Sequence, residues 1–141
     1  MALIARFLIH TSAAARMTQL SVRDRLEPLI SGGAVATCAT LDAEALFSAR
    51  SPSEYEQLRI DRATAYEYLP TDDRHWQLAF TAQRELARTG RHRGVAVPDL
   101  LTAVLAAEHR LTLVHYDGDF DTAAEVLDFQ QHWIAPRGTI T

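Results

Sequence analysis

The stretch Phe7-Leu8-Ile9-His10-Thr11-Ser12 decides the fold of this 141-residue chain. Its first half is apolar, which is typical of a buried strand, and its second half is polar, which is typical of a helix start. In open parallel sheets, ligands bind beyond the carboxyl ends of the strands. If this strand is central, His10, Thr11 and Ser12 lie in the crevice where a ligand binds, and the rest of the chain supplies their neighbours.

Strand-like and helix-like patterns alternate along the rest of the chain. Capping residues mark the expected helix starts, which are Thr11 or Ser12, Ser21, Thr40, Ser51, Asp72 or Asp73, and Pro98-Asp99. The expected strands cover residues 3–9, 34–38, 66–69, 111–116 and 132–134. This alternation, with short connections, predicts an α/β fold in which helices cover both faces of a central parallel sheet. We expect a single domain over residues 1–141.

The composition excludes several activities. All 14 basic residues are arginine, so the chain has neither the lysine of a phosphate-binding Walker loop nor an amine for Schiff-base chemistry. A phosphate-accepting receiver domain would also be expected to carry a lysine. Cys38 is the only cysteine, which rules out an intramolecular disulfide, suits a reducing cytoplasm and indicates a small core side chain rather than a nucleophile. The apolar run over residues 2–9 is too short to cross a membrane.

Acidic side chains gather at the ends of the expected elements. Glu44 lies in a helix, Asp99 at a helix start, and Asp117, Asp119 and Asp121 follow an apolar strand. Carboxylates that converge without a cation repel one another, and Mg²⁺ and Mn²⁺ prefer oxygen ligands. A divalent cation held there neutralises charge at a phosphodiester, so the pattern predicts hydrolysis of a nucleic-acid backbone.

Each carboxylate also has a plainer interpretation. Asp99 could be only a helix cap, Glu44 only a solvated helix residue, and Asp121 only a charge at a helix start. The stretch from Asp117 to Asp121 mimics the start of a calcium-binding loop, but Thr122 and Asp128 stand where that loop needs glycine and glutamate. Ser12 lacks the glycine-flanked turn of a nucleophile, so we expect it to support the site.

Taken together, these motifs resemble a PIN-domain ribonuclease of the VapC toxin type over essentially the full chain. The matching segments are the first strand with Thr11-Ser12, Leu41–Leu46 around Glu44, Pro98–Ala103 around Asp99, and Asp117-Gly118-Asp119-Phe120. The resemblance implies a three-layer α/β/α sandwich and cleavage of RNA with Mg²⁺ or Mn²⁺, held by Glu44, Asp99, Asp117 and Asp119. It also implies a homodimer and a cognate antitoxin that blocks the site. We expect a cytoplasmic location, since the single cysteine suits a reducing compartment and the N-terminal apolar run is too short to cross a membrane.

The chain departs from the family pattern at position 10, where the resemblance calls for an aspartate and the chain has His10. An imidazole nitrogen suits zinc, manganese or nickel better than magnesium, and it makes the cluster one charge less negative. We therefore expect weakened magnesium binding and impaired cleavage. The alternative is a catalytically silent protein of the same fold that binds its antitoxin or RNA without cleaving. A module with an unrelated small-molecule function has little support, because no glycine-rich phosphate loop follows a strand.

A basic stretch is the candidate RNA contact. It carries four arginines offset by Glu85, although a basic helix end also complements the helix dipole, and its members are Arg84, Arg88, Arg91 and Arg93. Structural or surface roles are expected for three histidines without shared ligand spacing, while His115 fits either a strand side chain or a site neighbour. Three aromatic residues on expected helices fit core or dimer contacts better than base-stacking platforms, namely Tyr55, Trp76 and Phe80.

Overall fold

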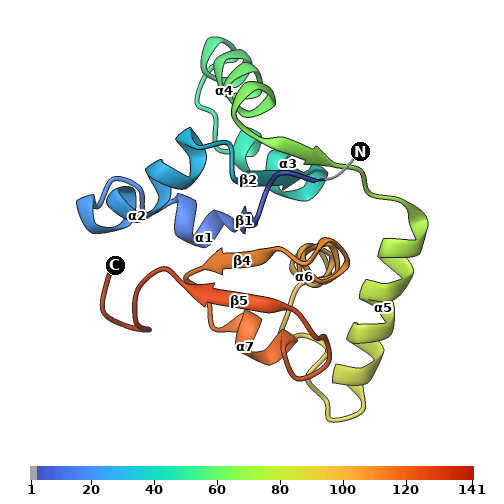
Figure 1. Cartoon of the computed structure of the whole chain (residues 1–141). Helices are drawn as coiled ribbons and strands as arrows, with labels where there is room; N and C mark the ends of the chain where they lie inside the picture. The colour runs from blue at the N-terminus through green and yellow to red at the C-terminus, as the bar shows by residue number, and fades with distance from the viewer. Residues whose placement is uncertain (1–2) are drawn as a thin grey trace.

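The computed structural model of the protein describes residues 3–141. Its five strands form one parallel sheet in the order β3-β2-β1-β4-β5 (Figure 1). The strands are β1 (Phe7–Ile9), β2 (Val35–Cys38), β3 (Glu67–Leu69), β4 (Thr112–His115) and β5 (Gln130–Trp133). The expected parallel sheet is confirmed.

Helices fill the connections between the strands. They are α1 (Thr11–Ala14), α2 (Leu20–Ser31), α3 (Ala39–Phe47), α4 (Pro52–Ala65), α5 (Asp73–Ala87), α6 (Val97–His109) and α7 (Asp119–Ala123). Among the described residues, no helix is both long enough and apolar enough to cross a membrane.

The strand that opens the chain lies at the centre of the sheet. It pairs with β2 on one side, where Leu8 is opposite Ala36, and with β4 on the other, where Ile9 is opposite Val114. Because all strands run in the same direction, their carboxyl ends share one edge of the sheet. Whatever follows Ile9 therefore lies beside whatever follows β4.

Alternate side chains along the strands pack into two apolar cores on opposite faces of the sheet. On one face Ile9 packs in a buried cluster with Val22 and Leu26, so α1 and α2 cover that face. On the other face Leu8 packs in a buried cluster with Leu41 and Leu105, so α3 and α6 cover it, and α5 packs against the outer side of α6. Helix α4 contributes no buried residue and projects at the top in Figure 1.

The ends of several elements differ from the sequence expectation. The first strand begins at Phe7 rather than residue 3, and Met1 and Ala2 lie outside the described residues. His10, rather than Thr11 or Ser12, is the N-cap of α1, because its ring Nδ1 accepts the backbone N–H of Ser12.

The other expected helix caps are confirmed only in part. Ser21 and Thr40 lie inside α2 and α3, which begin one residue earlier, and Asp99 lies in the first turn of α6 rather than at its cap. Ser51 and Asp72 are confirmed as caps, since each side chain accepts a backbone N–H three residues later.

Candidate metal site at the carboxyl edge of the sheet

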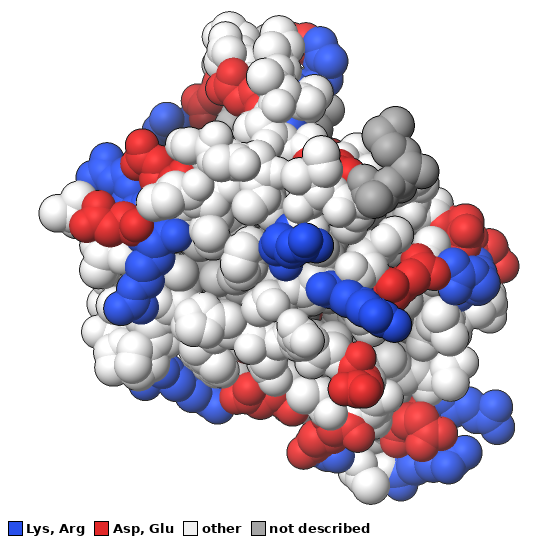
Figure 2. All heavy atoms as spheres, viewed as in Figure 1, with Lys and Arg blue, Asp and Glu red and all other residues white. Residues whose placement is uncertain are grey.

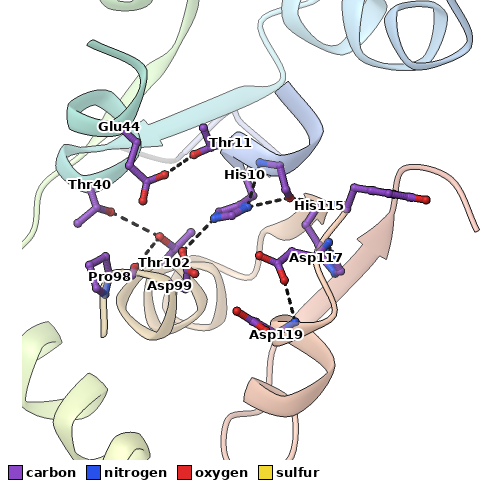
Figure 3. Close-up of polar contacts among 12 residues, drawn as sticks. His10, Thr11, Thr40, Glu44, Pro98, Asp99, Thr102, His115, Asp117 and Asp119 are labelled. Carbon is purple, nitrogen blue, oxygen red and sulfur yellow. Dashed lines mark hydrogen bonds and ion pairs between the residues drawn. The ribbon is translucent and has the colours of Figure 1, made fainter. Parts of the chain in front are cut away.

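Four separate elements bring polar side chains to the carboxyl end of β1 (Figure 3). His10 follows β1 directly, and Asp117 lies two residues after the end of β4. Glu44 lies on α3, and Asp99 lies in the first turn of α6, where the helix dipole favours a negative charge. The side chains proposed from the sequence as metal ligands are therefore neighbours in space.

His10 is held at the centre of this group with 6% of its surface exposed. Its Nδ1 lies 2.8 Å from the Ser12 hydroxyl and 3.2 Å from the Ser12 backbone nitrogen, which donates to it. Because Nδ1 accepts a hydrogen bond from this N–H, the ring proton belongs on the other nitrogen. His10 Nε2–H accordingly donates to Asp99 Oδ1 at 2.9 Å.

Ser12 and Thr11 each hold a neighbouring group in place through a hydrogen bond. The Ser12 hydroxyl oxygen accepts the backbone N–H of Tyr116 at 2.8 Å, which ties the start of α1 to the end of β4. The Thr11 hydroxyl donates to the Glu44 carboxylate and so turns it toward His10. Both contacts reduce the number of orientations that the site residues can adopt.

The segment after β4 forms a second acidic group. The backbone N–H of Asp119 donates to Asp117 Oδ1 at 2.9 Å, and the backbone N–H of Asp117 donates to His115 Nδ1 at 3.1 Å. His115 is fully buried, and its Nε2–H donates to Gln131 Oε1 at 2.7 Å. Burial lowers the pKa of His115 below its ordinary value, with the hydrogen bond to Gln131 opposing that change.

Two sets of potential ligand atoms share one residue. One set comprises His10, Glu44 and Asp99, and the other comprises Asp99, Asp117 and Asp119; within each set, the ligand atoms lie within 4.8 Å of one another. Burial raises the pKa of Asp119, and the carboxylates of Asp117 and Asp99 raise it further. A cation removes this repulsion, so the all-carboxylate set fits a hard divalent ion such as Mg²⁺ or Mn²⁺.

An arginine lies against the acidic segment. The guanidinium of Arg137 packs so close to Gly118 that a Cβ built there would fall 2.8 Å from Arg137 Nη2. Its positive charge opposes the rise in the pKa of Asp119. Arg137 is thus a cation beside the carboxylates that no sequence motif indicated, because it follows the last strand in an irregular tail.

Thr102 and Asp121 lie near the site but belong to neither set of ligand atoms. Thr102, one turn after Pro98 on α6, donates its hydroxyl to the Pro98 carbonyl at 3.0 Å and lies 3.5 Å from the Thr40 hydroxyl. Asp121 is not in either ligand set, and its Oδ1 accepts the Trp133 indole N–H at 3.3 Å. Its position in the first turn of α7 matches the plainer interpretation of that residue.

The remaining predicted residues lie outside the carboxylate cluster. In the basic stretch, which begins in the last turn of α5 and continues beyond it, Arg88 pairs with Glu85 and Arg91 pairs with Glu125. Phe80 and Tyr55 are partly exposed, and Cys38 is buried in the core as expected. A hollow of about 250 Å³ between α3 and α4 is also separate from the site, and its polar wall is an internally paired network of Thr37, Asp42 and Arg62.

The fold and the site define a class: an α/β protein whose carboxylates converge beyond the central strands of a parallel sheet. The PIN-domain family model matches residues 8–126. The chain is also 39% identical over 134 residues to Ribonuclease VapC21 of Mycobacterium tuberculosis. The aligned residues make up 95% of this chain and 97% of that protein. The chain therefore belongs to the PIN-domain family.

Further relatives agree with this assignment. Ribonuclease VapC51 of Mycobacterium tuberculosis is 38% identical over 135 residues, which is 96% of this chain and 97% of that protein. The crystal structure of DNA-bound VapBC from Salmonella typhimurium has the same fold, with a TM-score of 0.69 at 17% identity over 93% of this chain and 99% of that one.

Proposed function

We propose that this protein is a toxin-class endoribonuclease that cleaves RNA phosphodiester bonds with a divalent cation. The observation that carries the proposal is Asp99, whose carboxylate belongs to both sets of ligand atoms at the end of the central strand. Relatives named ribonuclease, with 39% and 38% identity over nearly the whole chain, support the same chemistry.

The residues of the site have distinct tasks in this proposal. Asp99, Asp117 and Asp119 hold the cation, which supplies positive charge against the scissile phosphate when it is bound. Thr11 orients Glu44 toward the same space. Arg137 places a guanidinium beside Gly118, where its planar fork suits a phosphate oxygen of the RNA.

The proposal includes impaired cleavage with Mg²⁺. His10 replaces a hard oxygen ligand with nitrogen, which Mg²⁺ binds poorly. In addition, the His10 ring already donates a hydrogen bond to Asp99 at 2.9 Å, so Asp99 Oδ1 must exchange this partner for the cation. Both effects lower Mg²⁺ occupancy and therefore the rate.

Substitution of the shared carboxylate tests the proposed activity. Asp99→Asn is expected to reduce RNA cleavage measured in Mn²⁺ by about 100-fold or more, since even changes beyond the metal ligands cost 10- to 100-fold. The matched control is Asp121→Asn, because Asp121 is an aspartate near the site that belongs to neither ligand set and accepts a hydrogen bond from Trp133, and this variant should cleave normally. Equal rates for Asp99→Asn and the unaltered chain would contradict the proposal.

The proposal also covers partners and location. We propose a cognate antitoxin that blocks the site, a homodimer and a cytoplasmic protein. An apolar groove at α3, α4 and β3 supports a protein partner, since Leu46, Phe47, Tyr55 and Tyr68 line it and Phe47 is 93% exposed. The fold is shared with VapBC-5 of Mycobacterium tuberculosis, a member of a family of toxin-antitoxin systems, which supports an antitoxin as one such partner.

The basic stretch is proposed as an RNA contact that acts mainly through charge. Figure 2 shows basic and acidic side chains interspersed on the displayed face, including the lower end of α5. Arg88 and Arg91 already pair with carboxylates, so RNA phosphates must compete for them. The double change Arg88→Ala with Arg91→Ala is expected to weaken RNA binding and to reduce the slope of log affinity against log salt by about 1 to 2. An unchanged salt slope, measured by fluorescence anisotropy with labelled RNA, would place the contact elsewhere.

The second candidate is a silent protein that binds antitoxin or RNA without cleaving. The observation that favours it is the hydrogen bond between His10 and Asp99, because it engages a carboxylate oxygen that a cation would need. A titration with Mg²⁺ and Mn²⁺ separates the two candidates. Failure of both ions to bind at millimolar concentration, with intact antitoxin binding, favours the silent protein.

A further inference from the structure

We propose that His10 makes one half of the site a position for a borderline transition-metal cation, such as Zn²⁺ or Co²⁺. The ligands are His10 Nε2 and the carboxylates of Glu44 and Asp99, and Ser12 is the positioning residue that lets His10 bind. The other half, with Asp99, Asp117 and Asp119, keeps the preference of carboxylates for Mg²⁺ or Mn²⁺. This inference rests on the proposed function only in placing metal binding at the same site.

The imidazole already points its Nε2 toward the other two ligands. Nε2 lies 2.9 Å from Asp99 Oδ1, and Glu44 offers a carboxylate oxygen within 4.8 Å of both residues' ligand atoms. The ring is fixed on two further sides, since Phe120 packs edge-on at 4.7 Å between ring centroids and Ser12 contacts Nδ1. Metal binding therefore needs no rotation of the His10 side chain.

The proton on Nε2 must leave this nitrogen before a cation can bind there. Moving the proton to Nδ1 preserves the charge of the ring, and the Ser12 hydroxyl oxygen at 2.8 Å is in place to accept the new Nδ1–H bond. This oxygen already accepts the Tyr116 N–H, and a hydroxyl oxygen has two lone pairs, so it can accept both. When the proton moves to Nδ1, the longer hydrogen bond from the Ser12 backbone N–H to Nδ1, at 3.2 Å, is lost.

The resulting arrangement is the usual one for a histidine that binds a metal. Such a ring donates its second N–H to a nearby acceptor, which fixes its orientation and its tautomer. One imidazole and two carboxylates supply three protein ligands, the number found in Zn²⁺ sites that leave a further position open. The neighbouring set has no nitrogen, so the two halves differ in the cations that they prefer.

The direct test observes the His10 ring nitrogens. A histidine-selective ¹H–¹⁵N NMR spectrum of the full chain reports the tautomer of each ring, and the His10 signals are identified as those lost in His10→Asp. Metal-free His10 should show the Nε2–H tautomer. Zn²⁺ should convert it to the Nδ1–H tautomer with a shifted Nε2 resonance. Retention of the Nε2–H tautomer at saturating Zn²⁺ overturns the proposal.

Variants then assign the two halves by calorimetric titration with Zn²⁺ and Mn²⁺. Ser12→Ala is expected to weaken Zn²⁺ binding by about 10- to 100-fold, and Ser12→Thr, which keeps the hydroxyl, should restore it. Asp119→Asn should weaken Mn²⁺ binding while leaving the Zn²⁺-dependent tautomer change of His10 intact. His132→Gln, at an exposed histidine, is the control for surface zinc and should bind as the unaltered chain does.

The outcomes separate this inference from the proposed ribonuclease. If Zn²⁺ shifts the His10 resonances but neither the chain nor His10→Asp cleaves RNA, the metal assignment holds and the proposed activity fails. If His10→Asp cleaves RNA while Zn²⁺ leaves the His10 resonances unchanged, the ribonuclease holds and the present inference fails. Equal Zn²⁺ affinity for Ser12→Ala and the unaltered chain removes Ser12 from the assignment and counts against the proposal.

Discussion

His10→Asp is expected to raise Mg²⁺-dependent RNA cleavage by about 10- to 100-fold, the scale on which the surroundings of a metal ligand alter affinity or activity. The change restores an oxygen ligand at the end of β1 and removes the hydrogen bond that occupies Asp99 Oδ1. It also removes the hydrogen bond from His10 and adds a second carboxylate close to Asp99, so the metal-free variant should unfold at a lower temperature than the unaltered chain.

Two measurements check this expectation. Initial cleavage rates in Mg²⁺ report the gain in activity, and thermal unfolding with and without Mg²⁺ reports the larger stabilisation by the cation in the variant. His10→Asn is the matched control, since it removes the imidazole without adding a negative charge. Equal cleavage by the unaltered chain and His10→Asp would remove His10 as the cause of impairment, and an equal gain in His10→Asn would show that the added charge is not the reason.

Phe120→Ala is expected to reduce the free energy of unfolding by about 3–5 kcal/mol, the usual cost of truncating a buried phenylalanine. Phe120 is fully buried at the start of α7 and packs against the rings of His10 and His115, at 4.7 Å and 4.9 Å between centroids. The same change removes the support on one side of His10. The variant should therefore lose part of its stability and part of its metal affinity together.

Urea unfolding followed by circular dichroism measures the stability change. Phe47→Ala provides the comparison, because Phe47 is 93% exposed and its truncation should alter the free energy of unfolding by no more than about 0.5 kcal/mol. A loss below about 1 kcal/mol for Phe120→Ala would mean that its neighbours close the cavity. The proposed support of His10 would then be wrong.

The sequence was sufficient to predict the parallel sheet because its three inner strands, β1, β2 and β4, are short, mainly apolar runs separated by helices. Leu8 and Ile9 pack into cores on opposite faces of the sheet. The first strand is therefore buried on both faces, as is usual for a central strand of a parallel sheet. Cap positions were less predictable, because several residues compete for the same N–H groups. Ser51 and Asp72 are confirmed as caps, whereas an imidazole, which is not among the usual capping side chains, caps α1.

Strand order alone predicts only part of the candidate site, and the resemblance to the PIN-domain pattern supplied the other candidates. Asp117 follows a strand next to β1, so its place beside His10 follows from the strand order. The approach of Glu44 and Asp99 depends on how α3 and α6 pack against the sheet, which local patterns do not encode. Arg137 could not be inferred either, since its contact with Gly118 depends on the path of the chain after β5.

The position of Asp99 in both ligand sets has a consequence for the protein in a mixture of ions. A carboxylate that serves two cations links their occupancies thermodynamically, so each ion changes the affinity for the other by the same factor. Neutralisation of shared charge favours joint occupancy, while competition for the same oxygens opposes it. The occupancy of each half of the site by its own metal then depends on the concentrations of both metals.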